Sequence, residues 1–383
     1  MPKTTGVYRD SKGRWYFKVR TRDRLTGEWQ QVTRRGFATA ADAGRARSEL
    51  LDEADTAAAA PALSALTVSE LLELYLDDAS VTGRLAAKTL FDYRHFADDY
   101  VSPWLGEKLV RELDAEMIAA WQHRLAKEGG TKDGRALSAN TIRLARAPLA
   151  GALKYAVARN IVPGNPLASV PPPRARRKIP KHWSPEQARQ FLALCEGDRL
   201  RPLWAFLLGS GLRIGEVVWL QWHNVDFERG LVRINEFATV INHEVVASVG
   251  KSRDAIRTVD IDEHLAQVLR QQRKTQASEQ LASADYEVTD YVFTKPNGGA
   301  HHPNHLSKVL AQLTVECGLP RLTAHGLRHT SATLMLASGV APKVAAERLG
   351  HADATLFSNL YSHVTPTMQR EAAERIGAAL FGE

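Results

Sequence analysis

Apolar residues recur at helical spacing through the second quarter of the chain. The stretch Thr67-Val68-Ser69-Glu70 forms a capping box, in which two side chains bind the free backbone N–H groups at a helix start. Helical patterns continue over about residues 87–100, 114–127 and 139–159, and the sequence VPGNP at 162–166 ends them. We therefore predict a block of four helices. One face of the first helix would carry Val68, Leu71, Leu72, Tyr75 and Leu76.

The N-terminal segment has a different pattern. Two runs rich in aromatic and β-branched residues, Trp15–Val19 and Trp29–Val32, each follow a turn sequence, at 10–13 and 25–27 respectively, which predicts strands. A helical pattern follows from about residue 40 to residue 55. An alanine run broken by Pro61 then has the composition of a linker.

The last part of the chain is predicted to be mostly helical with a small sheet. Ser184 and Gln187 can cap its first helix, with Pro185 at the favoured first position. Residues 231–234 and 258–261 have strand-like sequences, and we expect Lys251 to project from a hairpin between them. A large aromatic and aliphatic cluster at 204–208 is predicted to be core.

These patterns predict a multidomain, mainly α fold with four segments. Residues 1–60 form a sheet with a helix, residues 66–170 form the helical block, and residues 183–383 form a mixed α/β domain that is mostly helical. Residues 171–182 are proline-rich and basic, as expected of an extended, positively charged tether.

Charge favours a polyanionic partner. The 383 residues carry a formal charge of +7 with a pI near 9.4, and residues 1–36 alone hold ten basic side chains against three acidic ones. With two cysteines there is no disulfide framework, so a reducing cytosol is expected. We find no signal peptide and no apolar run long enough to cross a membrane.

The candidate chemistry lies near the C-terminus, in HGLRH at 325–329, LGH at 349–351 and Tyr361. A phenol can attack a phosphodiester once its pKa falls. The guanidinium of Arg328 matches phosphate with a planar fork of donors. His325 and His351 titrate near neutrality and can move protons. This set of residue types suits phosphoryl transfer.

A second phosphate clamp is expected upstream. Three glycines surround Arg213 in the sequence GSGLRIGE at 209–216, which permits a tight turn between two helices. Glu216 then falls in the first turn of the following helix, where the macrodipole favours an acid. Lys251 is the candidate general acid.

Together these motifs resemble the tyrosine recombinase, or phage integrase, family. The resemblance rests on GLRIGE, the lysine in a hairpin, HGLRH, LGH and a tyrosine ten residues after that histidine. It implies that Tyr361 attacks DNA to form a 3′-phosphotyrosine, with Arg213 and Arg328 as clamps. Lys251 would protonate the leaving oxygen, His325 would accept the nucleophile's proton, and His351 would donate to the phosphate. Glu216 and Gly350 would support the site. No metal, nucleotide or other cofactor is implied.

The resemblance also implies an architecture and partners. Residues 1–60 would be a three-stranded arm-type DNA-binding domain and residues 66–170 a SAM-like core-binding domain. The expected partners are double-stranded DNA at core and arm sites, three further copies in a homotetramer, and accessory DNA-bending or excision-directing proteins, in the bacterial cytoplasm and nucleoid. A metal site at His301, His302 and His305 is disfavoured because no acidic or thiol ligand lies beside them. The candidate DNA contacts are Arg14, Lys18, Arg20, Arg34, Lys88, Arg143, Arg176, Arg177, Arg253 and Arg257. Further candidates for phosphate contact in the helical block, which the sequence does not rank, are Arg94, Lys132, Arg135, Arg146 and Lys154.

Several alternatives stay open. A type IB topoisomerase-like enzyme would share the tyrosine chemistry, but the basic N-terminal sheet and the helical block argue against it. A non-catalytic DNA-binding protein would not need a tyrosine at this spacing. Within the recombinases, a chromosome-dimer resolvase usually lacks the basic sheet, so we favour the integrase of a phage or integrative element.

Overall fold

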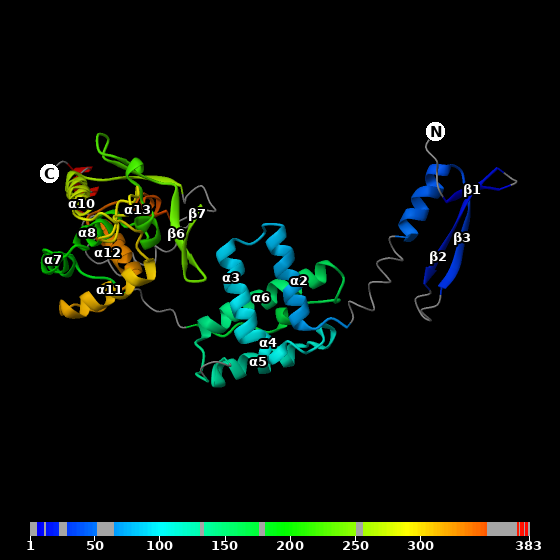
Figure 1. The fold of residues 1–383 in the computed structure, drawn as a ribbon. Coiled ribbons are helices and arrows are strands. Elements are labelled where there is room, and N and C mark those ends of the chain that lie inside the picture. The colour runs from blue at the N-terminus through cyan, green and yellow to red at the C-terminus, as the bar shows by residue number, and fades with distance from the viewer. Residues whose placement is uncertain are drawn as a thin grey trace. The chain divides into compact units, whose positions relative to one another are not determined.

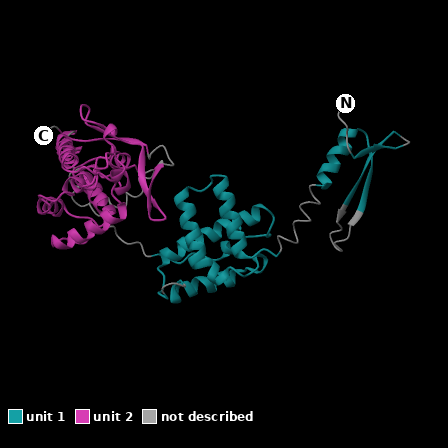
Figure 2. Cartoon of the chain, viewed as in Figure 1, with its two compact units in different colours: residues 1–176 teal, residues 177–383 magenta. Residues whose placement is uncertain are grey.

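The computed structural model describes residues 6–10, 13–22, 29–51, 65–130, 134–175, 181–249 and 256–350, together with 374, 376–378, 380 and 381. The chain forms two compact units, residues 1–176 and 177–383 (Figures 1 and 2). Each unit is considered by itself.

The N-terminal segment is an antiparallel sheet of three strands in the order β1-β2-β3 (Figure 1). Strand β2 alternates in its central part: Phe17 and Val19 are buried with Ala43 of the helix at residues 40–51, whereas Lys18 and Arg20 are exposed. The predicted strands and helix are confirmed, although the sheet is longer than the sequence pattern indicated. Its strands are β1 (Val7–Arg9), β2 (Trp15–Arg22) and β3 (Trp29–Phe37).

The helical block has its own core. The capping box at Thr67 and Glu70 is present, and the apolar face that it begins is buried with Trp121 and Leu149. The helix predicted at 87–100 is interrupted, because the helix widens into a π-helical turn at Ala97–Val101 before it continues. The helices are α2 (Val68–Val81), α3 (Ala87–Phe96), α4 (Ser102–Leu105), α5 (Ala115–Glu128) and α6 (Ala139–Ala158).

One predicted DNA contact in this block is wrong. Arg146 is buried in the helical core, where its guanidinium donates hydrogen bonds of 2.7 Å to Gln122 Oε1 and to the Val170 carbonyl. A buried guanidinium must find internal acceptors, and these two acceptors tie α6 to α5 and to the end of the block. Arg146 therefore stabilises the core.

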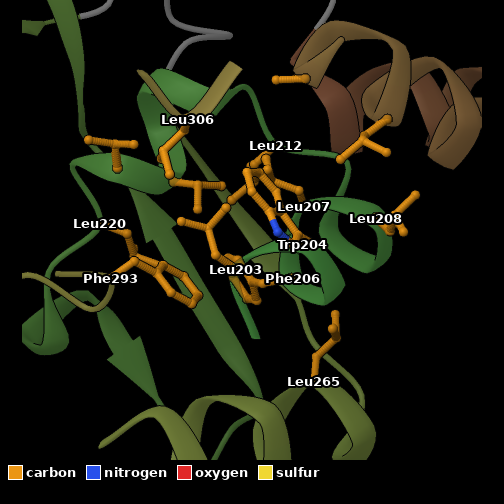
Figure 3. Close-up of a cluster of buried hydrophobic side chains, with 14 of the residues drawn as sticks. Leu203, Trp204, Phe206, Leu207, Leu208, Leu212, Leu220, Leu265, Phe293 and Leu306 are labelled. Carbon is orange, nitrogen blue, oxygen red and sulfur yellow. The ribbon is translucent and has the colours of Figure 1, made fainter. Parts of the chain in front are cut away.

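The second unit surrounds helix α8, whose Trp204, Phe206 and Leu207 are fully buried (Figure 3). Helix α8 packs against α10 and α12, and this packing holds the turn that follows α8 in place. The predicted core at 204–208 is confirmed. The helices of this unit are α7 (Pro185–Leu194), α8 (Arg201–Ser210), α9 (Ile214–Val218), α10 (Glu263–Ala282), α11 (Pro303–Glu316), α12 (Ala324–Ala337) and α13 (Pro342–Leu349).

The sheets of this unit correct the predicted hairpin. Strands β5 and β8 pair antiparallel as expected, in a sheet of order β4-β5-β8. However, a separate hairpin, β6 with β7, lies between them in sequence, so residues 250–255 connect β7 to β8 and not β5 to β8. The strands are β4 (Val225–Asp226), β5 (Leu231–Ile234), β6 (Glu236–Ile241), β7 (Glu244–Val249) and β8 (Arg257–Asp260). Among the described residues, no helix has the length and apolar character needed to span a membrane.

Candidate active site

The turn between α8 and α9 brings the first arginine into place. Gly211 adopts the left-handed conformation, with φ +69°, and a Cβ atom there would lie 2.4 Å from Leu349 Cδ2. Only glycine meets both constraints without strain. Two residues later, Arg213 is the N-cap of α9, and its backbone N–H donates to Glu216 Oε2 over 2.8 Å. The predicted place of Glu216 in the first turn of α9 is confirmed.

The Arg213 side chain is partly exposed and oriented by two acceptors. It donates to Glu216 Oε1 over 2.9 Å and to the Gly350 carbonyl over 3.0 Å. With 45% of its side-chain surface exposed, it keeps further N–H donors for a ligand. A guanidinium held in this way is suited to binding an anion at the surface.

Arg328 lies beside it, one helical turn after His325 on α12. The residue is only 2% exposed, and it donates to the Gly211 carbonyl over 3.0 Å and to the Leu349 carbonyl. Burial, together with the nearby Arg213 charge, lowers the pKa of Arg328 to about 9, so the group stays charged at neutral pH. A buried cation of this kind presents a fixed charge that water screens weakly.

Glu216 is enclosed by two arginines. Its carboxylate, 4% exposed, accepts from Arg213 and from both terminal nitrogens of Arg257, at 3.0 and 2.9 Å. Burial raises the pKa of Glu216, but the hydrogen bonds and charge of Arg257, followed by those of Arg213, outweigh it and lower the pKa below its ordinary value. Glu216 therefore stays ionised and fixes the positions of the two guanidinium groups.

Arg257 does not lie where a DNA contact would be. The sequence makes it a candidate for contact with the DNA backbone, but its side chain is 8% exposed and donates to Glu216 and to the Arg348 carbonyl. The low exposure and the three internal hydrogen bonds give it a supporting place behind Arg213. Sequence alone offers no signal for this, because a basic residue in a short strand is more often exposed.

The C-terminal end of α13 gathers these arginines. Three successive carbonyls, those of Arg348, Leu349 and Gly350, accept from Arg257, Arg328 and Arg213 respectively. The last carbonyls of a helix lack intrahelical partners and carry partial negative charge, so cations are favoured there. The end of α13 therefore orients both predicted phosphate clamps.

Two histidines complete the described part of the site. The rings of His325 and His329 meet edge to face, with centroids 4.5 Å apart. Partial burial, and then the charges of Arg328 and Arg213, lower the pKa of His325 below its ordinary value. Burial, followed by His325 and Arg328, lowers the pKa of His329 to about 4. Both rings are therefore neutral at pH 7, the state in which an imidazole can accept a proton.

The structure thus brings together three predicted catalytic residues, Arg213, His325 and Arg328, with the predicted supporting residues Glu216 and Gly350. Six predicted residues lie outside the described part of the chain: Lys251, His351 and Tyr361 of the catalytic set, and Arg176, Arg177 and Arg253 of the DNA-contact set. The further candidate Lys132 lies outside it as well. Among the described residues, no group of three or more His, Cys, Asp or Glu side chains could hold a metal ion.

Comparisons with known proteins agree with this geometry. A sequence model of the phage integrase family matches residues 181–368, and a model of an arm DNA-binding domain matches residues 6–54. The chain belongs to the tyrosine recombinase, or phage integrase, family. It is a DNA strand-breaking and rejoining enzyme of that family.

Curated relatives support the same assignment, and a solved structure shares the fold. The chain is 29% identical to a XerC-like tyrosine recombinase of Caldanaerobacter subterraneus, covering 81% of this chain and 83% of that protein. It is 22% identical to the ICEBs1 integrase of Bacillus subtilis, covering 80% of this chain and 81% of that protein. The Tn1549 transposon integrase bound to transposon right end DNA is similar in fold, with a TM-score of 0.67 at 21% identity, covering 82% of this chain and all of that one.

The N-terminal sheet of this recombinase has one solvent face that suits nucleic acid. Strand pairing places Tyr16 beside Tyr8 and Arg35, and Lys18 beside Thr33, with Arg20 two residues further along β2. The Arg35 guanidinium lies 5.5 Å from the Tyr16 ring centroid. Strand alternation puts all of these side chains on the face opposite Phe17.

Four of the other predicted contacts differ in their surroundings. Arg34 pairs with Phe17, so it lies on the helix-covered side of the sheet, at its exposed margin. Lys88 pairs with Asp92 one helical turn away. Arg143 is exposed on α6, and Arg14, also exposed, precedes β2.

Proposed function

We propose that this recombinase integrates and excises a phage or integrative mobile element at specific DNA sites, through a 3′-phosphotyrosine formed by Tyr361. The observation that carries the chemistry is the convergence of Arg213 and Arg328 on the last carbonyls of α13, immediately before His351. Two fixed guanidinium groups can neutralise the non-bridging oxygens of a phosphodiester as charge develops in the transition state.

The remaining steps are assigned by chemistry. Tyr361 attacks the scissile phosphorus, and the 5′-oxygen leaves as Lys251 protonates it. Neutral His325 takes the phenolic proton, and His351 donates a hydrogen bond to the phosphate. A 5′-hydroxyl from the partner strand then attacks the phosphotyrosine, which rejoins the DNA and frees Tyr361. The bond energy stays in the phosphotyrosine, so the cycle needs no nucleotide or other energy source.

The mobile-element assignment is supported by the N-terminal sheet. Its solvent face carries Tyr8, Tyr16, Lys18, Arg20 and Arg35, which combine stacking rings with positive charge, and an integrative element's integrase is among the relatives. We propose that this face binds arm-type DNA sites while the helical block and the second unit bind the core site. The protein would act as a homotetramer on DNA in the bacterial cytoplasm, with accessory proteins that bend DNA or direct excision.

Covalent trapping tests the chemistry. The protein is incubated with a nicked suicide duplex that contains the junctions flanking its own gene, and adducts are separated on a denaturing gel. We expect an adduct with the wild type and none with Tyr361→Phe, which keeps DNA binding. Tight binding without an adduct would favour a non-catalytic DNA-binding protein, and an adduct from the Phe variant would move the nucleophile elsewhere.

A chromosome-dimer resolvase is the second candidate, because the XerC-like relative covers most of the chain. The two are separated by removing residues 1–60. An integrase should then cleave the core site normally but lose its preference for long DNA that carries arm sites. A wild type that binds long and short DNA equally would favour the resolvase.

A further inference from the structure

Arg257 is placed as a link between two parts of the active site. All three of its nitrogens are used: Nη1 and Nη2 donate to the two oxygens of Glu216, and Nε donates to the Arg348 carbonyl over 3.0 Å. This bidentate geometry fixes the plane of the Glu216 carboxylate as well as its charge. A lysine could supply the charge but not the plane.

Strand β8 and helix α13 are joined by two hydrogen bonds, one donated from each element. Arg257 on β8 donates to the Arg348 carbonyl, and Arg348 Nη1 donates back to the carbonyl of Asp260 on β8 over 2.8 Å. Each side chain therefore holds the backbone of the other element. Since Leu349 and Gly350 follow directly, the position of β8 sets where their carbonyls meet Arg328 and Arg213.

The fixed orientation of the Glu216 carboxylate in turn orients Arg213. The carboxylate accepts from the backbone N–H and from Nη1 of Arg213 while Arg257 occupies its other lone pairs. Without Arg257, the buried carboxylate would have Arg213 as its one remaining guanidinium partner and would be free to rotate toward it. Arg213 would then turn its donors inward, away from a phosphate at the surface.

We propose that Arg257 is a positioning residue for recombination, which acts through Glu216 and the end of α13 to orient the Arg213 guanidinium toward the scissile phosphate and makes no contact with DNA. The inference rests on the proposed function of the site. It assigns Arg257 a role different from that of an exposed basic residue at the DNA surface.

The variants are Arg257→Met and Arg257→Lys, with Arg199→Met as a matched control. Arg199 forms the same kind of fork, with Glu279 at 2.5 and 2.8 Å, and it also donates to a carbonyl, that of Thr294. These partners belong to α10 and to the turn near residue 294. Its removal therefore reports the general effect of losing a partly buried arginine fork in the same unit.

Three quantities are measured for each protein: the Kd for a core-site duplex, the single-turnover rate of adduct formation, and the thermal unfolding midpoint. We expect Arg257→Met to slow adduct formation at least about tenfold while Kd changes less than about threefold. Arg257→Lys should recover part of the rate. Arg199→Met should lower the unfolding midpoint without the same loss of rate.

A duplex with a methylphosphonate at the scissile position distinguishes a positioning role from a merely structural one. A merely structural role predicts the same loss of rate on this duplex as on the natural phosphate. The methylphosphonate is neutral, so a misplaced arginine clamp costs less, and the rate penalty of Arg257→Met should shrink at least about threefold relative to the natural phosphate. The penalty of Arg199→Met should stay the same on both substrates.

The inference fails if Arg257→Met slows the reaction equally on both substrates, if its Kd weakens in step with the rate, or if Arg199→Met loses rate equally. A wild type that forms no Tyr361-dependent adduct overturns the proposed function and this inference with it. A reactive wild type whose Arg257→Met variant reacts equally fast overturns the inference alone.

Discussion

The Arg213 guanidinium donates to the Gly350 carbonyl over 3.0 Å and so joins two positions that are 137 residues apart in the chain. Gly350 also ends α13 in the left-handed conformation, with φ +66°, immediately before the predicted catalytic residue His351. One hydrogen bond therefore ties the orientation of a predicted phosphate clamp to the helix end that precedes the predicted nucleophile in the chain. The predictions below follow from this coupling and from the burial of its members.

The two clamp arginines should differ in what their removal does to stability. Arg213→Ala and Arg328→Ala should each raise the activation free energy of adduct formation by several kcal/mol, because each removes a fixed positive charge that stabilises the transition state. Arg328→Ala should also lower the free energy of unfolding by about 2–4 kcal/mol, since it leaves the buried Gly211 and Leu349 carbonyls without these donors. Arg213→Ala, whose side chain is partly exposed, should change it much less. Urea unfolding and single-turnover trapping measure the two effects, and equal losses of stability would contradict the described burial.

Gly350→Ala should impair both folding and cleavage. A Cβ atom at this position would lie 2.8 Å from Arg257 Cζ, so the guanidinium that binds Glu216 must shift. Gly339→Ala is a matched control, because Gly339 has a similar φ of +79° and no heavy atom within 4 Å of its Cβ position. Both variants should lose about 1 kcal/mol from the left-handed backbone.

Only Gly350→Ala should in addition slow adduct formation, at least about tenfold. The comparison therefore separates backbone strain from displacement of Arg257. Equal cleavage rates in the two alanine variants would mean that the contact with Arg257 has no catalytic consequence.

Acid should destabilise the second unit through His329. Its pKa is about 4 in the folded protein against 6.5 for an ordinary histidine, so the unfolded chain binds more protons between these values. Stability is therefore lost as the pH falls from 6.5 toward 4, and His325 adds to the loss in the same direction because its pKa is also lowered. The free energy of unfolding, measured with urea at several pH values in this range, should change less steeply with pH in His329→Gln than in the wild type. An equally steep pH dependence would contradict the assignment.

The rate of cleavage should follow His325 as the pH changes. Because the pKa of His325 lies below 6.5, the ring is neutral at pH 7 and should accept the phenolic proton there. The rate should not fall until the pH drops below 6.5. His325→Gln should remove that acid limb and lower the plateau. A limb that persists in the variant would belong to another group.

The two faces of the N-terminal sheet should differ in their effect on arm-site binding. Lys18→Ala and Arg20→Ala remove charge from the solvent face, whereas Arg34→Ala removes the same charge from the side that carries Phe17. Each of the first two should weaken binding and reduce the slope of log Kd against log salt by about 1. Arg34→Ala should do neither, and an equal effect of all three would indicate that only total charge matters.

Much of this fold could be predicted from local sequence. The capping boxes at Thr67 and Ser184 begin helices as expected, because a cap is satisfied by residues three positions away. The motifs around Arg213 and His325 indicated the chemistry for the same reason, since neighbouring residues carry the recognisable pattern. The hairpin of β6 and β7 was missed, because its strands alternate weakly between buried and exposed positions.

Tertiary structure decided what each basic residue does. Arg146, Arg257 and Arg328 have the same side chain as the exposed Arg143, yet they are buried because acceptors reach them from distant parts of the chain. The partner of Arg257 is 41 residues away, and the Gly211 carbonyl that binds Arg328 is 117 residues away. The sequence by itself determined the helix starts and predicted the reacting groups, because both depend on near neighbours. Burial and orientation depend on which distant carbonyl or carboxylate the fold brings within hydrogen-bonding distance, and only the folded chain specifies that.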